Sequence, residues 1–195
     1  ARRYQFLDEI DMKEAEILKE GKILIYPTDT IWGIGCDALN VSAIEKVKQI
    51  KGRDNTKSFI LLMRDENMIK EYIPNIPPAT LTLLHENQKK NIPTTILYPN
   101  PVGLPMQHLS FNNYIGIRIP DNDFLQEVFK EFPFPIVSSS ANFSGKESPR
   151  FFNEIDKDFL SKADYVSLFY QDDCSIKESS SIFIITEDNS IKQLR

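Results

Sequence analysis

The chain has 195 residues, of which 41% are hydrophobic and 26% are charged, and these values are typical of a globular protein. A chain of this length can bury one well-formed core, so we expect a single domain over residues 1–195. It has no run of 18 apolar residues and no apolar signal core, so we expect a cytoplasmic protein without membrane contact. The net charge of −5 argues against nucleic-acid binding through bulk electrostatics, although a local basic patch could still contact RNA. Two cysteines and two histidines match no metal-ligand spacing, so no metal site is expected.

Capping residues and apolar spacing predict several helices. Asp11, Ser42 and Asp65 each stand before a segment with helical apolar spacing, which is the position of a helix N-cap. Glu14 and Glu45 follow the first two caps by three residues and complete a capping-box pattern. The predicted helices are 11–21, a helix from 42 into KGRDNTK, a helix from 65 through 72, 79–88 and 121–132, with a helical or mixed segment at 150–164.

Short apolar or alternating runs between these helices predict strands. The alternation implies an α/β fold in which a twisted sheet of mixed parallel and antiparallel strands is flanked by helices. The predicted strands are 23–26, 58–63, 94–98, 114–119, 135–139 and 165–169, with a closing hairpin of 181–186 and 191–194. The segments 99–113 and 171–180 are expected to be loops.

The stretch KILIYPTDTIWGIGCDAL, residues 22–39, contains the first candidate site. Pro27 ends the strand before it, because proline has no N–H to donate to a neighbouring strand. Three short polar side chains follow at positions 28–30, and two glycines beyond them let the backbone approach a ligand closely. This order favours a small-molecule site in an α/β sheet, and a tight turn between two strands is the alternative.

Lys51, Arg53 and Lys57 place three cations within seven residues of a predicted loop. Arginine offers a planar fork for phosphate oxygens and lysine a mobile point charge, so the three could form an anion clamp. A solvated surface is the alternative for such a charge run.

The segment SSSANFSG, residues 138–145, is rich in hydrogen-bonding side chains. Ser138, Ser140 and Asn142 share one side of an extended chain, where they could bind phosphate or a polar substrate. The alternative is a serine-rich loop that caps a helix. No Gly-x-Ser-x-Gly elbow surrounds the segment and no histidine is placed as a base, so a Ser–His hydrolase is not expected.

Isoleucines alternate with Tyr114, Gly116 and Arg118 over residues 114–119. Arg118 therefore points away from the apolar face of its strand, either as a site residue or as a residue at the edge of the sheet. The chain has no Walker A loop, GxGxxG or HExxH motif, so a nucleotide would need another cradle.

Taken in order, these motifs resemble those of the YrdC/Sua5 family, the threonylcarbamoyl-AMP synthases of tRNA modification. YPTDTIWGIGCDA resembles the family's YPT-acid-T-x-x-G-x-G-C-D opening, and KGRDNTKS resembles its K-x-R segment. IPTTIL, residues 92–97, resembles a degenerate G-P-L-T, and YIGIRIP resembles V-x-V-R-x-P. PIVSSSANFSG resembles P-x-V-S-T-S-A-N-x-S-G, and SSSI resembles P-S-T-I near the C-terminus. The resemblance spans about residues 10–195.

The resemblance implies a YrdC/RibB-like fold and a nucleotidyltransferase reaction. The amine of L-threonine and bicarbonate would form a carbamate, which attacks the α-phosphorus of ATP to give L-threonylcarbamoyladenylate and pyrophosphate. Partner proteins would then transfer the threonylcarbamoyl group to adenosine in tRNA. Such a step needs aligned reactants and cations for the developing charge, but no protein nucleophile. Mg²⁺ bound with ATP would share that charge.

The resemblance also implies roles for individual residues. Lys51 and Arg53 would be the catalytic residues that hold ATP phosphates, and Arg118 would pair with the carboxylate of threonine. The implied threonine-binding residues are Thr28, Thr30, Arg118, Ser138, Ser180 and Ser181. The implied ATP-binding residues are Lys51, Arg53, Lys57, Thr95, Ser140, Asn142 and Ser148.

Several positions depart from the family pattern, so other functions stay open. Ser58 and Ser179 replace the usual prolines, and Ser139 replaces the usual threonine. These departures leave room for a paralogue of changed substrate. A related enzyme that forms a carbamoyl adenylate from carbamoyl phosphate, as in hydrogenase maturation, is a separate alternative. An RNA-binding or ribosome-maturation module is the other alternative, and the acidic net charge argues against it.

Overall fold

The computed structural model describes residues 12–195, and in this part of the chain nine strands form one sheet. The strand order is β7-β1-β2-β6-β3-β5-β4-β8-β9. Three neighbouring pairs are parallel and the others are antiparallel, which confirms the predicted mixed sheet. The strands are β1 Leu24–Tyr26, β2 Gly33–Gly35, β3 Ile60–Leu62, β4 Thr94–Pro99, β5 Tyr114–Arg118, β6 Ile136–Ser140, β7 Tyr165–Val166, β8 Ser181–Ile185 and β9 Ile191–Gln193.

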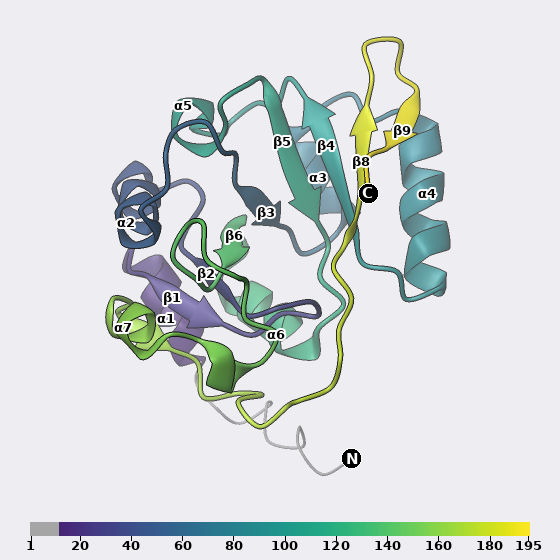
Figure 1. Ribbon diagram of the computed structural model, residues 1–195. Coiled ribbons are helices and arrows are strands. Elements are labelled where there is room, and N and C mark those ends of the chain that lie inside the picture. Colours follow the sequence, from purple (N-terminus) through teal and green to yellow (C-terminus); the bar gives the residue numbers. More distant parts are fainter. Residues whose placement is uncertain (1–11) are drawn as a thin grey trace.

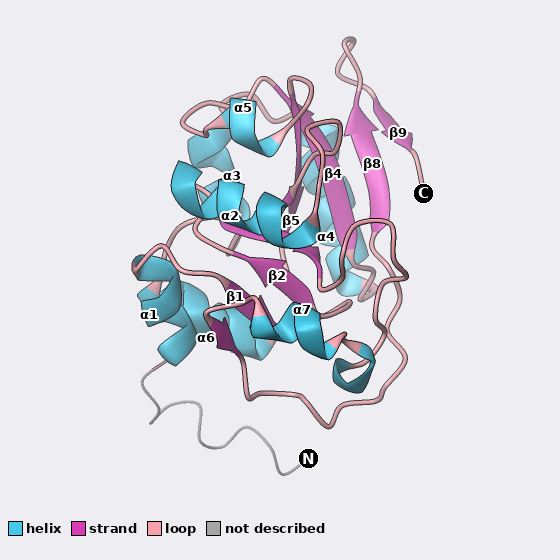
Figure 2. Ribbon diagram, turned by 60° about the vertical axis from the view of Figure 1, so that its left-hand side comes forward, coloured by secondary structure: helices cyan, strands magenta, loops and turns pink. Residues whose placement is uncertain are grey.

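Helices flank this sheet along its length. Figures 1 and 2 show α1, α6 and α7 around β1 and β2 at one end, and α3 and α4 beside β4 toward the other. The helices are α1 Lys13–Lys19, α2 Val41–Lys51, α3 Glu66–Tyr72, α4 Pro78–Lys89, α5 Met106–Leu109, α6 Asp123–Glu131 and α7 Lys157–Ser161, with a 3-10 turn at Phe152–Glu154. No helix in residues 12–195 is long and apolar enough to cross a membrane.

Helix α6 illustrates how the sequence builds this core. Its first turn is capped by the Asn122 side chain, which accepts a hydrogen bond of 3.0 Å from the Leu125 N–H. Four apolar side chains at helical spacing are at least 99% buried, and each stabilises the fold by roughly 1.5–3 kcal/mol. They are Phe124, Leu125, Val128 and Phe129.

The start of helix α2 differs from the capping predictions. Helix α2 begins at Val41, because the Asn40 side chain caps it by accepting from the Ala43 N–H at 3.0 Å; the predicted cap at Ser42 is wrong. Glu45 does not complete a capping box and instead contacts Lys48 and His108. The predicted cap at Asp11 lies outside the described residues. Its partner Glu14 is buried and accepts a hydrogen bond from the Ser167 hydroxyl at 2.8 Å.

The strand β2 was not predicted, because its three residues carry no strand pattern of their own. It pairs antiparallel with β1 on one side and with β6 on the other. A Cβ atom at Gly35 would lie 1.7 Å from the carbonyl oxygen of Val137, so glycine is required there by the packing of two strands rather than by a ligand. The loop predicted at 99–113 also contains helix α5, whose Leu109 is buried.

Candidate active site

The turn between β1 and β2 is held by its two threonines. The Thr28 hydroxyl donates to the Ile31 carbonyl at 2.6 Å and accepts from the Thr30 N–H at 3.0 Å. The two threonine hydroxyls lie 3.1 Å apart, and both residues are buried. These contacts form a local turn of the kind that short polar side chains favour, and they fix the direction of the Thr30 hydroxyl.

Arg118 meets this turn from the end of β5. Because β5 lies between β3 and β4, Arg118 is not an edge residue, and its side chain is only 5% exposed. Its Nη1 donates to Asp29 Oδ1 in an ion pair, and its Nη2 lies 3.3 Å from the Thr30 hydroxyl. Asp29 is 9% exposed, and its other oxygen accepts from the Asp121 N–H at 3.1 Å. The guanidinium is therefore fixed in place by Asp29 and Thr30.

Lys51 ends α2 and joins this helix to the loop after β6. Its Nζ donates to the carbonyl oxygens of Ser140 and Asn142, the latter at 3.0 Å, and its own carbonyl accepts from the Ser144 N–H at 2.7 Å. Burial, together with the nearby positive charges of Arg53 and Lys57, lowers the pKa of Lys51 to about 7. Lys51 therefore shapes the 140–144 loop from behind.

Arg53 lies beside the middle of β6. Its guanidinium is stacked 4.6 Å from the centre of the Phe59 ring, and its Nη1 lies 3.4 Å from the Ser139 hydroxyl. Its Nη2 donates to the Ser58 carbonyl, while its buried Nε has no acceptor in the described part of the chain. Burial lowers the pKa of Arg53, against the opposing charge of Asp54. A fixed guanidinium with unused hydrogen-bonding capacity is suited to an anionic ligand.

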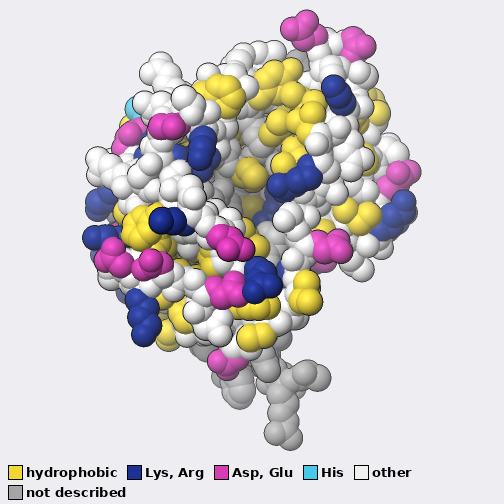
Figure 3. Space-filling view, viewed as in Figure 1, with side chains coloured by type: hydrophobic (Ala, Val, Ile, Leu, Met, Phe, Trp, Pro, Cys, Tyr) yellow, Lys and Arg dark blue, Asp and Glu magenta, His cyan; other side chains and the backbone are white. Residues whose placement is uncertain are grey.

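These segments enclose one cavity of about 580 Å³. Figure 3 shows that this face of the molecule is hollowed near its centre, with Lys and Arg side chains around the hollow. Seven of the residues predicted for the site line the cavity: Thr30, Arg53, Arg118, Ser138, Ser140, Ser148 and Ser180.

The other predicted site residues lie behind or beside the cavity wall. Thr95 is fully buried and its hydroxyl lies 2.8 Å from that of Ser180, so it supports a residue of the wall. Lys57 is exposed, and its Nζ lies 3.4 Å from the Ser144 hydroxyl. Ser181 begins β8 and pairs with Thr94. Thr28, Lys51 and Asn142 act through the neighbours described above, and Asn142 Oδ1 is a buried acceptor without a partner among residues 12–195.

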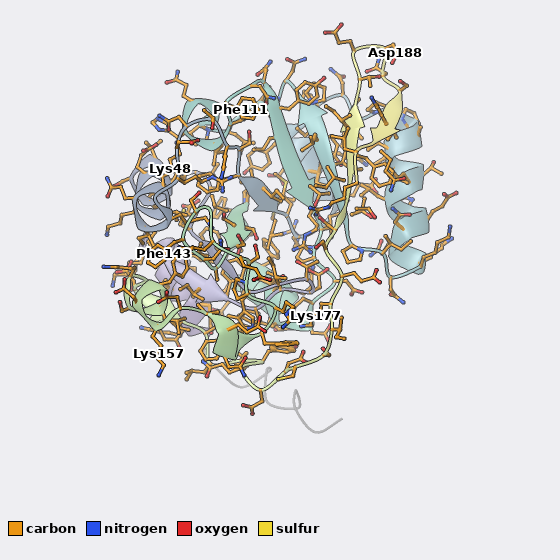
Figure 4. The ribbon with its side chains drawn as sticks, viewed as in Figure 1. Lys48, Phe111, Phe143, Lys157, Lys177 and Asp188 are labelled. Atoms are coloured by element: carbon orange, nitrogen blue, oxygen red, sulfur yellow. The ribbon has the colours of Figure 1, made fainter. Side chains whose placement is uncertain are left out.

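Sequence reasoning missed four charged residues of this region. Asp29 was noted as a polar residue of the turn, but its pairing with Arg118 was not predicted. Arg150, Lys177 and Arg195 line the cavity without belonging to any motif. Figure 4 shows Lys177 on the segment that leads to β8, and its Nζ lies 3.4 Å from the Thr28 carbonyl and 3.2 Å from Asp173. The only sequence signal for these three was positive charge, which is common on surfaces.

A comparison of the sequence with models of known protein families identifies the family of this chain. Residues 16–195 match the model of the Sua5/YciO/YrdC family, which is described as telomere recombination. The chain belongs to the Sua5/YciO/YrdC family. In this member of the family the motifs quoted from the sequence meet at one cavity, since Thr30, Arg118 and Ser140 come from three of them.

Curated relatives of this Sua5/YciO/YrdC chain carry one activity in their names. This chain is 36% identical over 198 residues to a putative threonylcarbamoyl-AMP synthase of Methanocaldococcus jannaschii, and the match covers 96% of this chain and 88% of the relative. It is 28% identical over 157 residues to a threonylcarbamoyl-AMP synthase of Acinetobacter baumannii, covering 78% of this chain and 83% of the relative.

Solved structures support the Sua5/YciO/YrdC fold. A crystal structure of P. abyssi Sua5 in complex with L-threonine matches with a TM-score of 0.78 and 23% identity over 93% of this chain. E. coli YciO matches with a TM-score of 0.75 and 21% identity over 94% of this chain and 86% of YciO. This chain spans about half, 52%, of the length of the Sua5 chain, so that likeness concerns the fold of the shared part.

Proposed function

We propose that this chain is a threonylcarbamoyl-AMP synthase, which forms L-threonylcarbamoyladenylate and pyrophosphate from L-threonine, bicarbonate and ATP. The observation that carries the proposal is that Arg53 and Arg118, two arginines 65 positions apart, line one cavity together with serine hydroxyls. A cavity with two guanidinium groups can hold two anionic reactants side by side. The names of the curated relatives support the same activity.

The reaction needs alignment more than a reactive side chain. The threonine amine adds to bicarbonate with loss of water, and a carbamate oxygen then forms a bond to the α-phosphorus of ATP. The bond between the α-phosphorus and the bridging oxygen breaks, and pyrophosphate leaves with that electron pair. Holding both reactants in line lowers the barrier, and fixed cations stabilise the charge that develops on the phosphates.

We assign the two ends of the cavity to different reactants. Arg118 would pair with the carboxylate of threonine, and the hydroxyls of Thr30 and Ser138 beside it would hold the rest of the amino acid. Arg53 would hold ATP phosphates. The other threonine-side residues are Thr28, Ser180 and Ser181, and the other ATP-side residues are Lys57, Ser140, Asn142 and Ser148. Lys51 and Thr95, which the resemblance also assigns to ATP, would act through the residues that they hold in place.

We propose that Mg²⁺ enters the site bound to ATP. Among the described residues no cluster of three or more His, Cys, Asp or Glu side chains could hold a metal ion. Mg²⁺ often keeps several waters and is bound through substrate phosphates, and it would reduce the negative charge near the α-phosphorus. Arg53 and the serine hydroxyls would then orient the phosphates around it.

We propose that the protein works in the cytoplasm and passes its product to partner proteins. Proteins that transfer the threonylcarbamoyl group to tRNA would receive the product, because a carbamoyl–phosphate anhydride is unstable in water. Arg150, Lys177 and Arg195 at the cavity could also contact RNA directly. If RNA binding is undetectable even at low salt, this contact is excluded. A reaction that consumes ATP is consistent with the proposed cytoplasmic location.

The proposal is tested by the products that the protein forms. Purified protein is incubated with ATP, Mg²⁺, L-threonine and bicarbonate, pyrophosphate release is followed, and the nucleotide product is identified by mass spectrometry. We expect pyrophosphate and threonylcarbamoyl-AMP only when all three substrates are present. Release that does not depend on threonine, or that requires carbamoyl phosphate in place of bicarbonate, would instead identify a paralogue with a different substrate.

A further inference from the structure

Two arginines line the same cavity, and the proposed reaction requires them to bind different anions. Arg53 would hold phosphates and Arg118 a carboxylate. A guanidinium group forms paired hydrogen bonds to either kind of anion, so the arginine side chain alone does not distinguish them. The distinction must come from the residues around each arginine.

The surroundings of the two guanidinium groups differ in charge. Arg118 is paired with the carboxylate of Asp29, and this pair is 5% and 9% exposed. In the described part of the chain no carboxylate lies within ion-pair distance of Arg53, which contacts the Ser139 hydroxyl and the Ser58 carbonyl. The charge of Arg118 is therefore offset by a carboxylate at contact distance, whereas that of Arg53 is not.

Asp29 is also fixed in place. One of its oxygens accepts from Arg118, and the other accepts from the Asp121 N–H at 3.1 Å. With both oxygens engaged, the carboxylate is held beside the guanidinium. A dianionic phosphate at Arg118 would be repelled by this nearby charge, and such repulsion is stronger in a poorly hydrated site than in water. The single carboxylate of an amino acid is repelled less, and its ammonium group offsets that repulsion when the amino acid binds, before the amine reacts with bicarbonate.

We propose that Asp29 determines the specificity of the Arg118 end of the cavity, so that it admits the carboxylate of an amino acid and excludes phosphate and pyrophosphate. The inference rests on the proposed function, because it takes the amino acid to bind at Arg118. It gives a physical reason why ATP and the amino acid occupy opposite ends of a cavity in which both ends carry an arginine.

The test removes the charge of Asp29 while keeping the shape of its side chain. Asp29→Asn retains an oxygen that can accept from Arg118, and Asp123→Asn is the matched control. Asp123 and Asp29 line the same second cavity, of about 520 Å³, but Asp123 has no contact with Arg118 in the described residues. Binding of inorganic phosphate to each protein is measured by titration calorimetry. We expect Asp29→Asn alone to bind phosphate at Arg118, in addition to any phosphate at Arg53, at least about tenfold more tightly there than the wild-type protein, and adding Arg118→Gln to abolish this gain.

The same set of variants contains the results that would overturn the proposal. Equal phosphate affinity in the wild-type protein and Asp29→Asn would do so, and so would a gain that survives Arg118→Gln. If Asp29→Asn does not fold, Asp29→Glu is measured instead. It keeps the charge, so its Arg118 end must exclude phosphate as that of the wild type does, and tighter phosphate binding would contradict the proposal. Phosphate binding does not require turnover, so a wild-type protein that releases no threonine-dependent pyrophosphate is recognised separately as a failure of the proposed function.

Discussion

Lys51 is the residue whose position departs most from the role that its motif implies. It was expected to hold ATP phosphates directly, but its Nζ donates to two backbone carbonyls of the loop after β6 and the residue is only 2% exposed. Burying a charged ammonium group without a carboxylate partner costs free energy. For this reason the pKa of Lys51 falls to about 7. Its effect on the site is therefore to position the backbone around Ser140.

The pKa of Lys51 predicts how stability changes with pH. The native pKa is about 7, whereas a lysine in the unfolded chain has a pKa near 10.4. Between these values the unfolded state binds a proton that the native state does not, so the free energy of unfolding rises with pH, by up to about 1.4 kcal/mol per unit. Below pH 7 the native state bears the full free-energy cost of burying the Lys51 charge. Above about pH 10.4 the lysine is neutral in both states and this cost is absent.

In the Lys51→Met variant, the free energy of unfolding should not show this rise with pH. Urea unfolding at several pH values between 7 and 10 measures it, with Lys46→Met, an exposed lysine on the same helix, as the control that keeps the wild-type slope. If the free energy of unfolding changes with pH in the same way in the wild-type protein and in Lys51→Met, the lysine is protonated normally in the native state.

Single residues also show where sequence reasoning stopped. Thr30 and Arg118 were found because each belongs to a motif whose local pattern is visible. The pairing of Asp29 with Arg118 was not predicted, because it joins two positions that are 89 apart and their contact depends on the order of strands in the sheet. Arg195 reaches the cavity only because β9 pairs with β8, where its side chain donates to the Ser180 carbonyl at 2.9 Å.

At the level of elements, the start of α2 depends on one side chain that was assigned wrongly. Asn40→Ala should lower the free energy of unfolding by about 1 kcal/mol, because it leaves the Ala43 N–H without its acceptor. Ser42→Ala should change it by less than about 0.5 kcal/mol, because Ser42 is an exposed residue inside the helix. Chemical denaturation measures both, and an equal or larger effect of Ser42→Ala would support the cap predicted from sequence.

Strand β2 joins the turn that carries Thr30 to strand β6 with its serines. Gly35→Ala should cost about 3 kcal/mol or more, because the new Cβ would lie 1.7 Å from the Val137 carbonyl oxygen and force the strands apart. Gly52→Ala is the control, since its φ of +63° adds strain of about 1 kcal/mol while no atom lies within 4 Å of the added Cβ. Similar losses of stability in the two variants would contradict the close packing of β2 on β6.

The elements whose patterns are local were predicted well, and those defined by their neighbours were not. Helix α6 and the closing hairpin follow from apolar spacing within one segment. Strand β2 has only three residues, two of them glycine, and exists because β1 and β6 lie on either side of it. Local propensity carries no information about such a strand.

At the scale of the whole molecule, the sheet order creates the site. β6 lies between β2 and β3, and β5 lies between β3 and β4, so the serines of β6 and Arg118 of β5 are separated by a single strand. The mixed sheet could be predicted from the alternation of helices and strands, but this order could not, because it depends on long-range pairing. Figure 1 shows the segment after α7 crossing the molecule to reach β8, which brings Ser180 to the same cavity.

We propose that one cavity holds a nucleotide at Arg53 and an amino acid at Arg118. Steady-state kinetics of pyrophosphate release by Arg53→Ala and Arg118→Ala, with ATP and L-threonine varied in turn, tests it most directly. Arg53→Ala should raise the KM for ATP at least about tenfold and leave that for threonine nearly unchanged, and Arg118→Ala should do the opposite. The reversed pattern, or an increase in the same KM in both variants, would contradict the account.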